Sequence, residues 1–296
     1  MFNILTPTYN RAHLIHRVYE SLCQQTYKGF NWIVIDDAST DDTQSLIETW
    51  KQETSDFDID YYCLSENQGK PKAVNFGLEK CHDKITIIAD SDDTFVANSL
   101  EDIKAIWEEI DQTKNNIAAV WTLVVDEDDQ IKGDVFPEDK WIVGFKERVL
   151  DMKKELVGDK WTSWRTEILK AHPLYADSES HVEESQTWNR INKKYDFLCV
   201  NKVFLKAHVS PNSLITSKKS RKQIARGGYY SAYYALKDVK TNDIFKYKYY
   251  RTQAFNYVKS WLFYSDKSLR LKPLKLMACL LVFLAYIPKR LIRKVR

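Results

Sequence analysis

Carboxylate-rich segments stand out in the first third of the chain. Asp90 and Asp92 are separated by one residue and follow an apolar run, an arrangement that suits a hard divalent cation. Asp36 and Asp37 follow another apolar run and could accept hydrogen bonds from a ligand. Two more polar segments also follow apolar runs, so polar side chains recur wherever a strand could end. The four polar segments span residues 6–11, 36–43, 67–77 and 90–93.

Alternating strand and helix signals position these segments. Ser39 and Thr40 are expected to cap the second helix, and Ser99 the fourth. Repeated strand–helix units predict an α/β fold with a mostly parallel sheet flanked by helices. Such sheets bind ligands beyond the carboxyl ends of their strands, where the polar segments lie. The expected strands are 2–5, 30–35, 59–64, 85–89 and 118–125, and the expected helices are 11–25, the run from Thr40 to Trp50, 70–80 and 99–110.

The second half of the chain is less regular. A helix is expected at 183–191 and a strand at 197–206. From about residue 217 the composition shifts to a basic segment, 218–226, followed by many tyrosines. We therefore expect an α/β domain over residues 1–217 and a helical, aromatic-rich and basic C-terminal extension over residues 218–296.

Taken together, the four polar segments resemble the signature of glycosyltransferase family 2, whose members have the GT-A fold. The resemblance runs in order from Phe2 to about Ile215. It implies a metal-dependent, inverting glycosyltransferase that moves a sugar from a UDP-sugar to a glycan or lipid-linked acceptor in cell-surface polysaccharide synthesis. The segments read Thr6-Pro-Thr-Tyr-Asn-Arg11, Asp36-Asp37-Ala-Ser-Thr-Asp-Asp-Thr43, Asn67-Gln-Gly-Lys-Pro-Lys-Ala-Val-Asn-Phe-Gly77 and Asp90-Ser-Asp-Asp93.

The resemblance implies a nucleotide site in these segments. Asp37 matches the family's carboxylate that accepts the uracil N–H, and Tyr9 matches an aromatic residue that packs on the base. The alternative is that Asp36 and Asp37 are only a charge cluster near a helix N-terminus, where Asp is favoured. The residues assigned to the nucleotide are Pro7, Thr8, Tyr9, Arg11, Asp37, Lys70, Asp90 and Ser91.

The same resemblance implies a divalent cation, Mn2+ or Mg2+, at the Asp-x-Asp segment. Asp92 matches the main metal ligand, and Asp90 matches the residue nearer the ribose. His208 is a candidate to complete the metal shell or to contact the diphosphate. A solvated acidic turn is the alternative for the carboxylates, and most lone histidines play neither of these roles.

An inverting transfer needs a carboxylate that takes the proton from the acceptor hydroxyl. The family often has Glu-Asp at a helix start in this region, whereas this chain reads His181-Val-Glu183-Glu184-Ser-Gln-Thr-Trp188-Asn-Arg190. We favour Glu184 as the base, with Glu183 as the second candidate. A charged pair at a helix start, without a catalytic role, is the alternative.

Charge is unevenly distributed along the chain. Residues 267–296 hold nine Lys/Arg and no Asp/Glu, so the net charge of +3 leaves about −6 on the remainder. An acidic body does not favour nucleic-acid binding, whereas a basic tail favours an anionic surface. The apolar run 276–287 is short for a spanning helix. We expect peripheral attachment to the inner face of the plasma membrane, with packing of the tail on protein as the alternative.

The remaining features favour a cytoplasmic enzyme. The five cysteines are scattered without a CxxC pair, which argues against disulfides and a zinc site, and no signal peptide is visible. Neither GxGxxG nor GxxxxGK[ST] occurs, which argues against a dehydrogenase or nucleotidyltransferase. The competing interpretation is a catalytically inactive GT-A-like protein that binds nucleotide or membrane. The full set of carboxylates (Asp37, Asp90, Asp92 and Glu183/Glu184) favours the enzyme.

Overall fold

The computed structural model describes residues 2–113, 116–153, 156–176, 182–208, 220–264 and 269–293, with side chains as far as residue 286. The chain forms two compact units. The first comprises residues 1–144, 154–174 and 190–216, and the second comprises residues 145–153, 175–189 and 217–296. The C-terminal helical region therefore shares its unit with two short segments from earlier in the chain.

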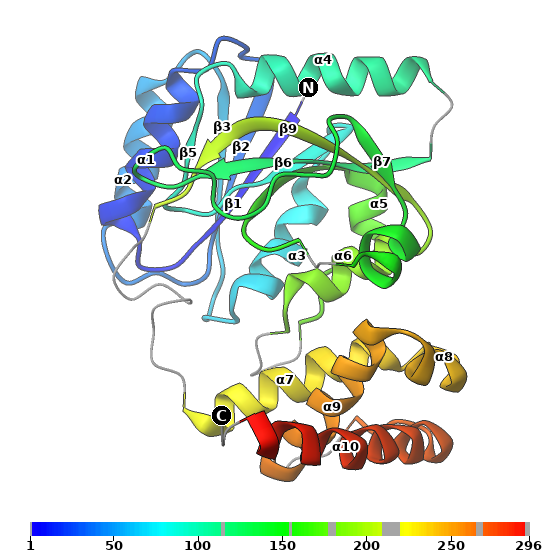
Figure 1. Cartoon of the computed structure of the whole chain (residues 1–296). Coiled ribbons are helices and arrows are strands. Elements are labelled where there is room, and N and C mark those ends of the chain that lie inside the picture. The colour runs from blue at the N-terminus through cyan, green and yellow to red at the C-terminus, as the bar shows by residue number, and fades with distance from the viewer. Residues whose placement is uncertain are drawn as a thin grey trace. The chain divides into compact units, whose positions relative to one another are not determined.

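A nine-stranded mixed sheet forms the centre of the first unit, in the order β3-β2-β1-β4-β8-β6-β9-β5, with β7 paired to β9 (Figure 1). The first four strands are parallel, as the strand–helix alternation predicts. Strand β8 then runs antiparallel between β4 and β6, and β5 and β7 run antiparallel to β9, while β6 and β9 are parallel. The strands are β1 (Phe2–Thr8), β2 (Phe30–Asp36), β3 (Asp58–Cys63), β4 (Ile85–Ile88), β5 (Thr94–Phe95), β6 (Ile117–Val125), β7 (Trp141–Val143), β8 (Lys160–Arg165) and β9 (Asp196–Lys206).

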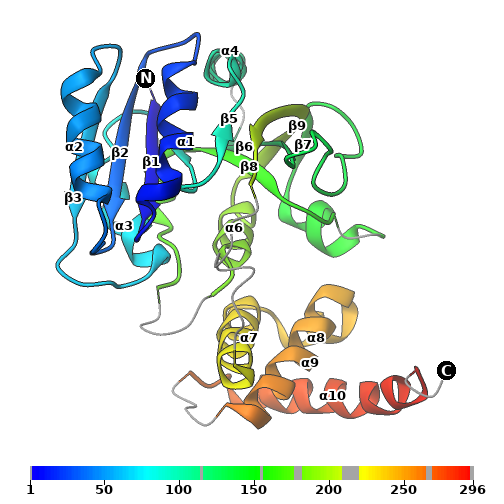
Figure 2. The same cartoon turned by 90° about the vertical axis from the view of Figure 1, so that its left-hand side faces the viewer.

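Helices cover both faces of this sheet (Figure 2). Helices α1 (Ala12–Cys23), α2 (Thr43–Glu53) and α4 (Ser99–Gln112) share one apolar core with alternate residues of the strands, such as Ile4 and Val34. Helix α3 (Lys70–Lys80) packs on the opposite face. There a Cβ atom on Gly77 would come within 2.3 Å of the Leu5 side chain, so only glycine allows this close approach. Helix α5 (Thr166–Ala171) contacts α3.

Two of the expected helix caps are wrong. Helix α2 begins at Thr43, whose N–H and hydroxyl both donate to Asp41 Oδ1, so neither Ser39 nor Thr40 caps it. Ser99 is already inside α4, and its hydroxyl donates to the Phe204 carbonyl at 2.7 Å. In both places a partner distant in sequence binds the side chain that a local capping rule assigns to the helix, because Asn10 binds the hydroxyls of Ser39 and Thr40, and Phe204 that of Ser99.

Several later elements escape the sequence patterns. Strands β5 and β7 are two and three residues long, too short to show a period. Strand β8 buries Ser163 completely, and that residue's hydroxyl accepts the Trp107 Nε1–H at 2.9 Å. A buried serine whose hydrogen bond comes from a distant tryptophan interrupts the apolar pattern by which a buried strand is recognised in the sequence. Trp161 and Trp164 on this strand are core residues, buried to 4% and 0% exposure.

The second unit is helical, as expected for the C-terminal region. Its core is rich in tyrosine, and the Tyr229 and Tyr257 rings stack with centroids 5.1 Å apart. Helix α7 (Arg221–Leu236) begins with a capping box between Ser220 and Gln223. Helix α6 (Glu184–Asn192) passes from the second unit into the first after Asn189. The other elements of this unit are the π-helical turn η1 (Lys146–Asp151), α7 (Arg221–Leu236), α8 (Thr241–Lys246), α9 (Lys248–Phe263) and α10 (Pro273–Arg293).

Candidate active site

Three of the four polar segments meet at one edge of the first unit's sheet. Thr8 ends β1 and lies in register with Asp36, which ends β2. The Asp37 N–H donates to the Thr8 carbonyl at 2.9 Å. Strand β4, which precedes Asp90, pairs with β1 on its other side. The carboxyl ends of three adjacent parallel strands therefore carry these segments, as the sequence predicts.

Asp37 shapes the loop that leads into α3. Its side chain is buried, and its two carboxylate oxygens accept the backbone N–H groups of Gln68 at 2.8 Å and Gly69 at 2.7 Å. Gly69 has φ +86°, a backbone conformation that favours glycine. Lys70, the first residue of α3, is placed by this turn. Asp37 thus connects the remaining polar segment, residues 67–77, to the three that meet at the edge of the sheet.

A second polar network holds the loops after β1 and β2 together. The Asn10 N–H donates to Ser39 Oγ at 2.8 Å, and the Thr40 N–H donates to Asn10 Oδ1 at 2.7 Å. The buried Asp36 accepts the Ser39 N–H and the Tyr61 hydroxyl, both at 2.7 Å. Burial and this carboxylate raise the pKa of Tyr61. Sequence patterns missed Asn10 and Tyr61, and only the polar type and position of Asn10 beside Tyr9 hinted at a role.

The two carboxylates of the Asp-x-Asp segment each face a cation from another predicted segment. Lys70 Nζ lies 2.6 Å from Asp90 Oδ1, and Arg11 Nη1 lies 3.1 Å from Asp92 Oδ2. Burial, together with the charges of Asp90 and Asp92, raises the pKa of the neighbouring Asp93 well above its usual range. Acidic and basic groups are thus interleaved where a diphosphate and a cation would have to be held.

The donor set fits a divalent cation only in part. Asp90 and Asp92 offer hard oxygen ligands of the kind that Mn2+ and Mg2+ accept. Among the residues that the structure describes, His, Cys, Asp and Glu side chains form no group of three or more that could hold a metal. His208 therefore does not join Asp90 and Asp92 in such a group. Two carboxylates suffice where a bound diphosphate supplies further oxygens, and that is the arrangement these residues fit.

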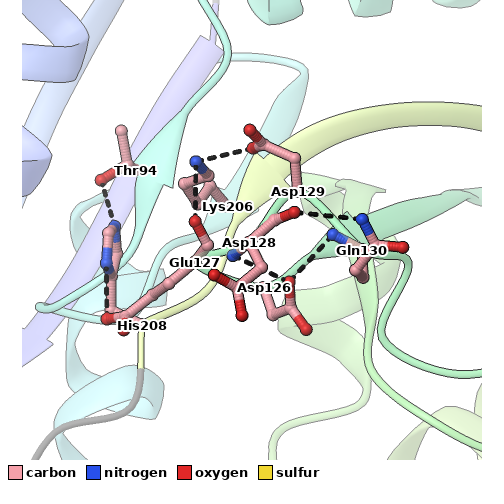
Figure 3. A network of polar contacts seen from close by, with 8 residues as sticks. All are labelled: Thr94, Asp126, Glu127, Asp128, Asp129, Gln130, Lys206 and His208. Carbon is pink, nitrogen blue, oxygen red and sulfur yellow. Dashed lines mark hydrogen bonds and ion pairs between the residues drawn. The ribbon is translucent and has the colours of Figure 1, made fainter.

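His208 instead bridges Thr94 and an acidic turn formed by residues 126–129 (Figure 3). One ring nitrogen, Nε2, lies 2.9 Å from Thr94 Oγ1, and the other, Nδ1, lies 3.1 Å from Glu127 Oε1. In the same turn, Asp129 pairs with Lys206 Nζ at 2.6 Å. Both His208 nitrogens are engaged by protein, so a contact with metal or diphosphate would require one of them to exchange its partner.

Apart from Asp37, which follows β2, the residues expected around the base and ribose lie on or just after β1 and β4. Tyr9 is 44% exposed, which leaves its ring open for stacking. The Thr8 hydroxyl is buried and has no hydrogen-bond partner among the described residues. An orphaned buried hydroxyl costs free energy unless a ligand satisfies it. Pro7 lies within β1, and Ser91, which stands between Asp90 and Asp92 in the sequence, is buried.

Glu183 and Glu184 lie in the second unit, at the start of α6. Glu183 is exposed, its N–H donates to Ser231 Oγ at 3.2 Å, and its carboxylate accepts the Ser185 hydroxyl at 3.3 Å. Glu184 is the first residue of the helix, where the positive end of the helix dipole stabilises a carboxylate. The helix begins one residue later than the sequence pattern indicates.

A polar chain that sequence patterns missed connects this helix to η1 and α9. Arg148 Nη2 donates to Asn189 Oδ1 at 2.6 Å, and Asn189 Nδ2 donates to the Tyr249 hydroxyl at 3.2 Å. Burial raises the pKa of Tyr249. Asn189 belongs to the run Glu184-Ser-Gln-Thr-Trp188-Asn-Arg190, and this run is the sequence signal from which the polar chain could have been found.

Known proteins similar in sequence match about a third of the chain. An uncharacterized glycosyltransferase of Rickettsia bellii is 37% identical over 99 residues, which are 33% of this chain and 14% of that protein. The poly(ribitol-phosphate) β-N-acetylglucosaminyltransferase TarS of Staphylococcus aureus is 30% identical over 111 residues, 36% of this chain and 19% of that protein. The matched stretches thus span less than a fifth of either relative.

Solved structures match nearly the whole chain. The crystal structure of S. aureus TarS 1–349 in complex with UDP-GlcNAc has a TM-score of 0.65 at 19% identity and covers 98% of this chain and 82% of that one. The mannosyltransferase PcManGT from Pyrobaculum calidifontis, in complex with GDP-Man and Mn2+, has a TM-score of 0.58 at 19% identity, with 98% and 81% covered. These likenesses show that the chain has the GT-A fold. The model of Glycosyl transferase family 2 matches residues 3–166, more than half of the chain, and the chain therefore belongs to that family.

Proposed function

We propose that the chain is a metal-dependent, inverting glycosyltransferase that moves a sugar from a UDP-sugar to a glycan or lipid-linked acceptor in cell-surface polysaccharide synthesis. One observation carries this proposal. Asp37, Asp90 and Asp92 come from neighbouring strand ends, and each already binds backbone N–H groups or a cation from another polar segment. The carboxylates and cations of such a site can exchange their contacts with one another for contacts with a metal ion and a diphosphate.

In this proposal the nucleotide lies on the loops after β1 and β2. The Tyr9 ring packs on the uracil, and Asp37 accepts the uracil N–H with lone pairs that Gln68 and Gly69 leave open. The orphaned Thr8 hydroxyl gains a partner from the nucleotide. Arg11 and Lys70 turn from Asp92 and Asp90 toward the diphosphate.

Asp92, with Asp90 beside it, would hold the divalent cation. When bound, this ion neutralises the charge that develops on the departing UDP. The solved PcManGT complex contains Mn2+ together with a nucleotide sugar, which supports the choice of a divalent ion. The neighbouring Asp93 carboxyl has a raised pKa because of burial and of the charges of these two carboxylates.

The chemical step assigned to the chain's own residues is proton removal. The Glu184 carboxylate takes the proton of the acceptor hydroxyl while that oxygen forms a bond to the anomeric carbon of the donor. The bond from the anomeric carbon to the UDP oxygen breaks on the opposite side, so the configuration inverts. Glu183 is the second candidate for this role. The acceptor is inferred from TarS, whose name gives a poly(ribitol-phosphate) substrate.

Product release with a panel of UDP-sugars tests the proposal. Incubation with each UDP-sugar, Mn2+ or Mg2+, and membrane lipid extract should release UDP with one donor above the rate without acceptor. Calorimetry should show that UDP binds more tightly when the metal is present. UDP binding without any turnover would favour an inactive nucleotide-binding protein, and the absence of UDP binding would overturn the site itself.

A further inference from the structure

Helix α10 is apolar on two opposite faces. Ala278, Cys279 and Val282 face the core of the second unit and are at most 4% exposed. The outer face carries four large apolar side chains that are 58–64% exposed: Leu274, Met277, Leu281 and Leu284. A helix that is apolar all round is normally buried on all sides, so the outer face calls for a partner.

The exposed residues form one stripe along the helix. Their spacing of three, four and three residues keeps them on one side of an α-helix over nearly three turns. In both views α10 runs along the lower part of its unit, next to α9 (Figures 1 and 2). We call Leu274, Met277, Leu281 and Leu284 the outer stripe.

Charge around the outer stripe is positive. Lys272, next to the start of the helix, is exposed. Lys275 points the other way, because its ammonium donates to the Leu236 and Lys237 carbonyls at the end of α7, and burial lowers its pKa. The chain carries further cations at Lys289, Arg290 and Arg293, and no acidic residue from 267 onward. Lys267, Lys294 and Arg296 lie outside the described residues.

We propose that α10 docks on an anionic lipid bilayer, lying in the plane of the interface with the outer stripe inserted at the boundary between headgroups and acyl chains. Exposed aliphatic side chains supply the apolar contact, and cations before and after them meet the headgroups. The inner face meanwhile stays packed on the core of the second unit. The two-sided apolar character of the helix follows, because one face serves the fold and the other serves the lipid.

In-plane docking agrees with the length and charge of the helix. No helix within the described ranges combines the length and apolarity that a membrane crossing requires. Helix α10 has 21 residues, but its core-facing residues are committed to protein, so lipid could reach only one side. Docking through one face needs no charged side chain to enter the hydrocarbon.

A second copy of the chain is the other occupant to consider. A symmetric dimer through this face would bring the same surface of both copies together. Each copy would add the positive charge of residues 267–296, which no acidic residue of that region offsets. Like charges would oppose such a contact, whereas the same charges favour an anionic bilayer. The bilayer is therefore the occupant that the charge pattern favours.

Flotation of the full chain with lipid vesicles tests the proposal. Vesicles of phosphatidylglycerol and phosphatidylcholine in equal amounts should carry the protein upward, and vesicles of phosphatidylcholine alone should carry less. The variant Leu281→Gln/Leu284→Gln should lower the partition coefficient by about tenfold or more. Removal of α10 is a poorer test, because truncation would open the core around Ala278 and Cys279.

Val157→Gln is the matched control, since Val157 is equally exposed at 61% but lies in the first unit. It should float like the unmodified chain. Leu284→Gln alone, with circular dichroism and UDP calorimetry on every variant, keeps the test valid if the double variant unfolds. Equal flotation of folded stripe variants and the unmodified chain would overturn the proposal. The proposal would also be overturned if the unmodified chain formed a dimer that dissociates in the stripe variants and did not bind lipid. UDP binding reports on the proposed function separately.

Discussion

Arg11 Nη1 lies 3.1 Å from Asp92 Oδ2, so the carboxylate assigned to the metal is paired with a cation from the loop after β1. Both side chains are mostly buried, at 20% and 16% exposure, which strengthens their attraction compared with a pair at the surface. A divalent cation at Asp92 would compete with this arginine for the negative charge of the carboxylate. The diphosphate of a donor offers the arginine a new partner, so metal and nucleotide should bind together more readily than either alone.

Arg11→Met should separate these two effects. Mn2+ without nucleotide should bind about three- to tenfold more tightly, because Asp92 no longer has a competing cation. UDP should bind more weakly, because the diphosphate loses a charged donor. Calorimetric titrations with Mn2+ and with UDP measure the two changes. Arg17→Met, which removes the next arginine along the chain, is the control. An unchanged Mn2+ affinity in Arg11→Met would refute the competition.

Asp37→Ala should weaken UDP binding even without metal, since the carboxylate is assigned to the base. It should also lower the melting temperature, because two hydrogen bonds to a buried carboxylate are lost at about 1.5–3 kcal/mol each.

Gly69→Ala separates base recognition from loop shape. It strains the same turn, which lies at φ +86° and ψ +154°, by about 1–3 kcal/mol and leaves the Asp37 carboxylate in place. If Asp37 reads the base, Asp37→Ala should lose far more UDP affinity than Gly69→Ala. Equal losses in the two variants, measured by calorimetry, would assign Asp37 to the loop alone.

Glu184→Gln should lower transfer by about 10²–10⁴-fold and leave UDP binding nearly intact, because a general base acts on the acceptor and not on the nucleotide. UDP release in the presence of acceptor measures the first quantity, and calorimetry the second. Glu183→Gln is the matched variant on the preceding residue. Inactivity of Glu183→Gln with a normal rate for Glu184→Gln would move the role by one residue. Normal rates in both would remove it from this helix.

Tyr61→Phe should lower the free energy of unfolding at pH 7 by about 1–3 kcal/mol, because Asp36 loses a hydroxyl donor. The folded pKa of Tyr61 is raised, so its contribution is complete below the unfolded pKa of about 10 and is lost as the pH rises above it. The difference in melting temperature between the unmodified chain and the variant should therefore narrow above pH 10.

Tyr62→Phe, on the same strand, is the control for that comparison. The Tyr62 ring, rather than its hydroxyl, makes two contacts. Lys80 Nζ lies 5.0 Å from the centroid of this ring, and the centroid of the Phe76 ring lies 6.2 Å from it. Removal of its hydroxyl should change the melting temperature little. A pH-independent difference for Tyr61→Phe, measured from pH 7 to pH 11, would show that the link to Asp36 does not titrate as described.

Local patterns in the sequence were enough for the first half of the fold and for a prediction of which residues form the site. The four parallel strands and the helices between them follow from apolar runs and helical spacing, which depend only on neighbours in the chain. The family likeness of the polar segments follows in the same way. Because parallel strands end at one edge of their sheet, the sequence also determined that Thr8, Asp37 and Asp90 belong together.

Only the tertiary structure decided which partner each polar group takes. Ser99 lies inside α4 and donates its hydroxyl to the Phe204 carbonyl, 105 positions away, and Asp37 supports the turn at Gly69. The sequence pattern does not reveal strand β8, because its buried Ser163 is polar and obtains its hydrogen bond from the distant Trp107. The division of α10 into a core face and an exposed face also emerges only in three dimensions. Hydropathy gives both faces the same apolar character, and packing against the second unit's core buries just one of them.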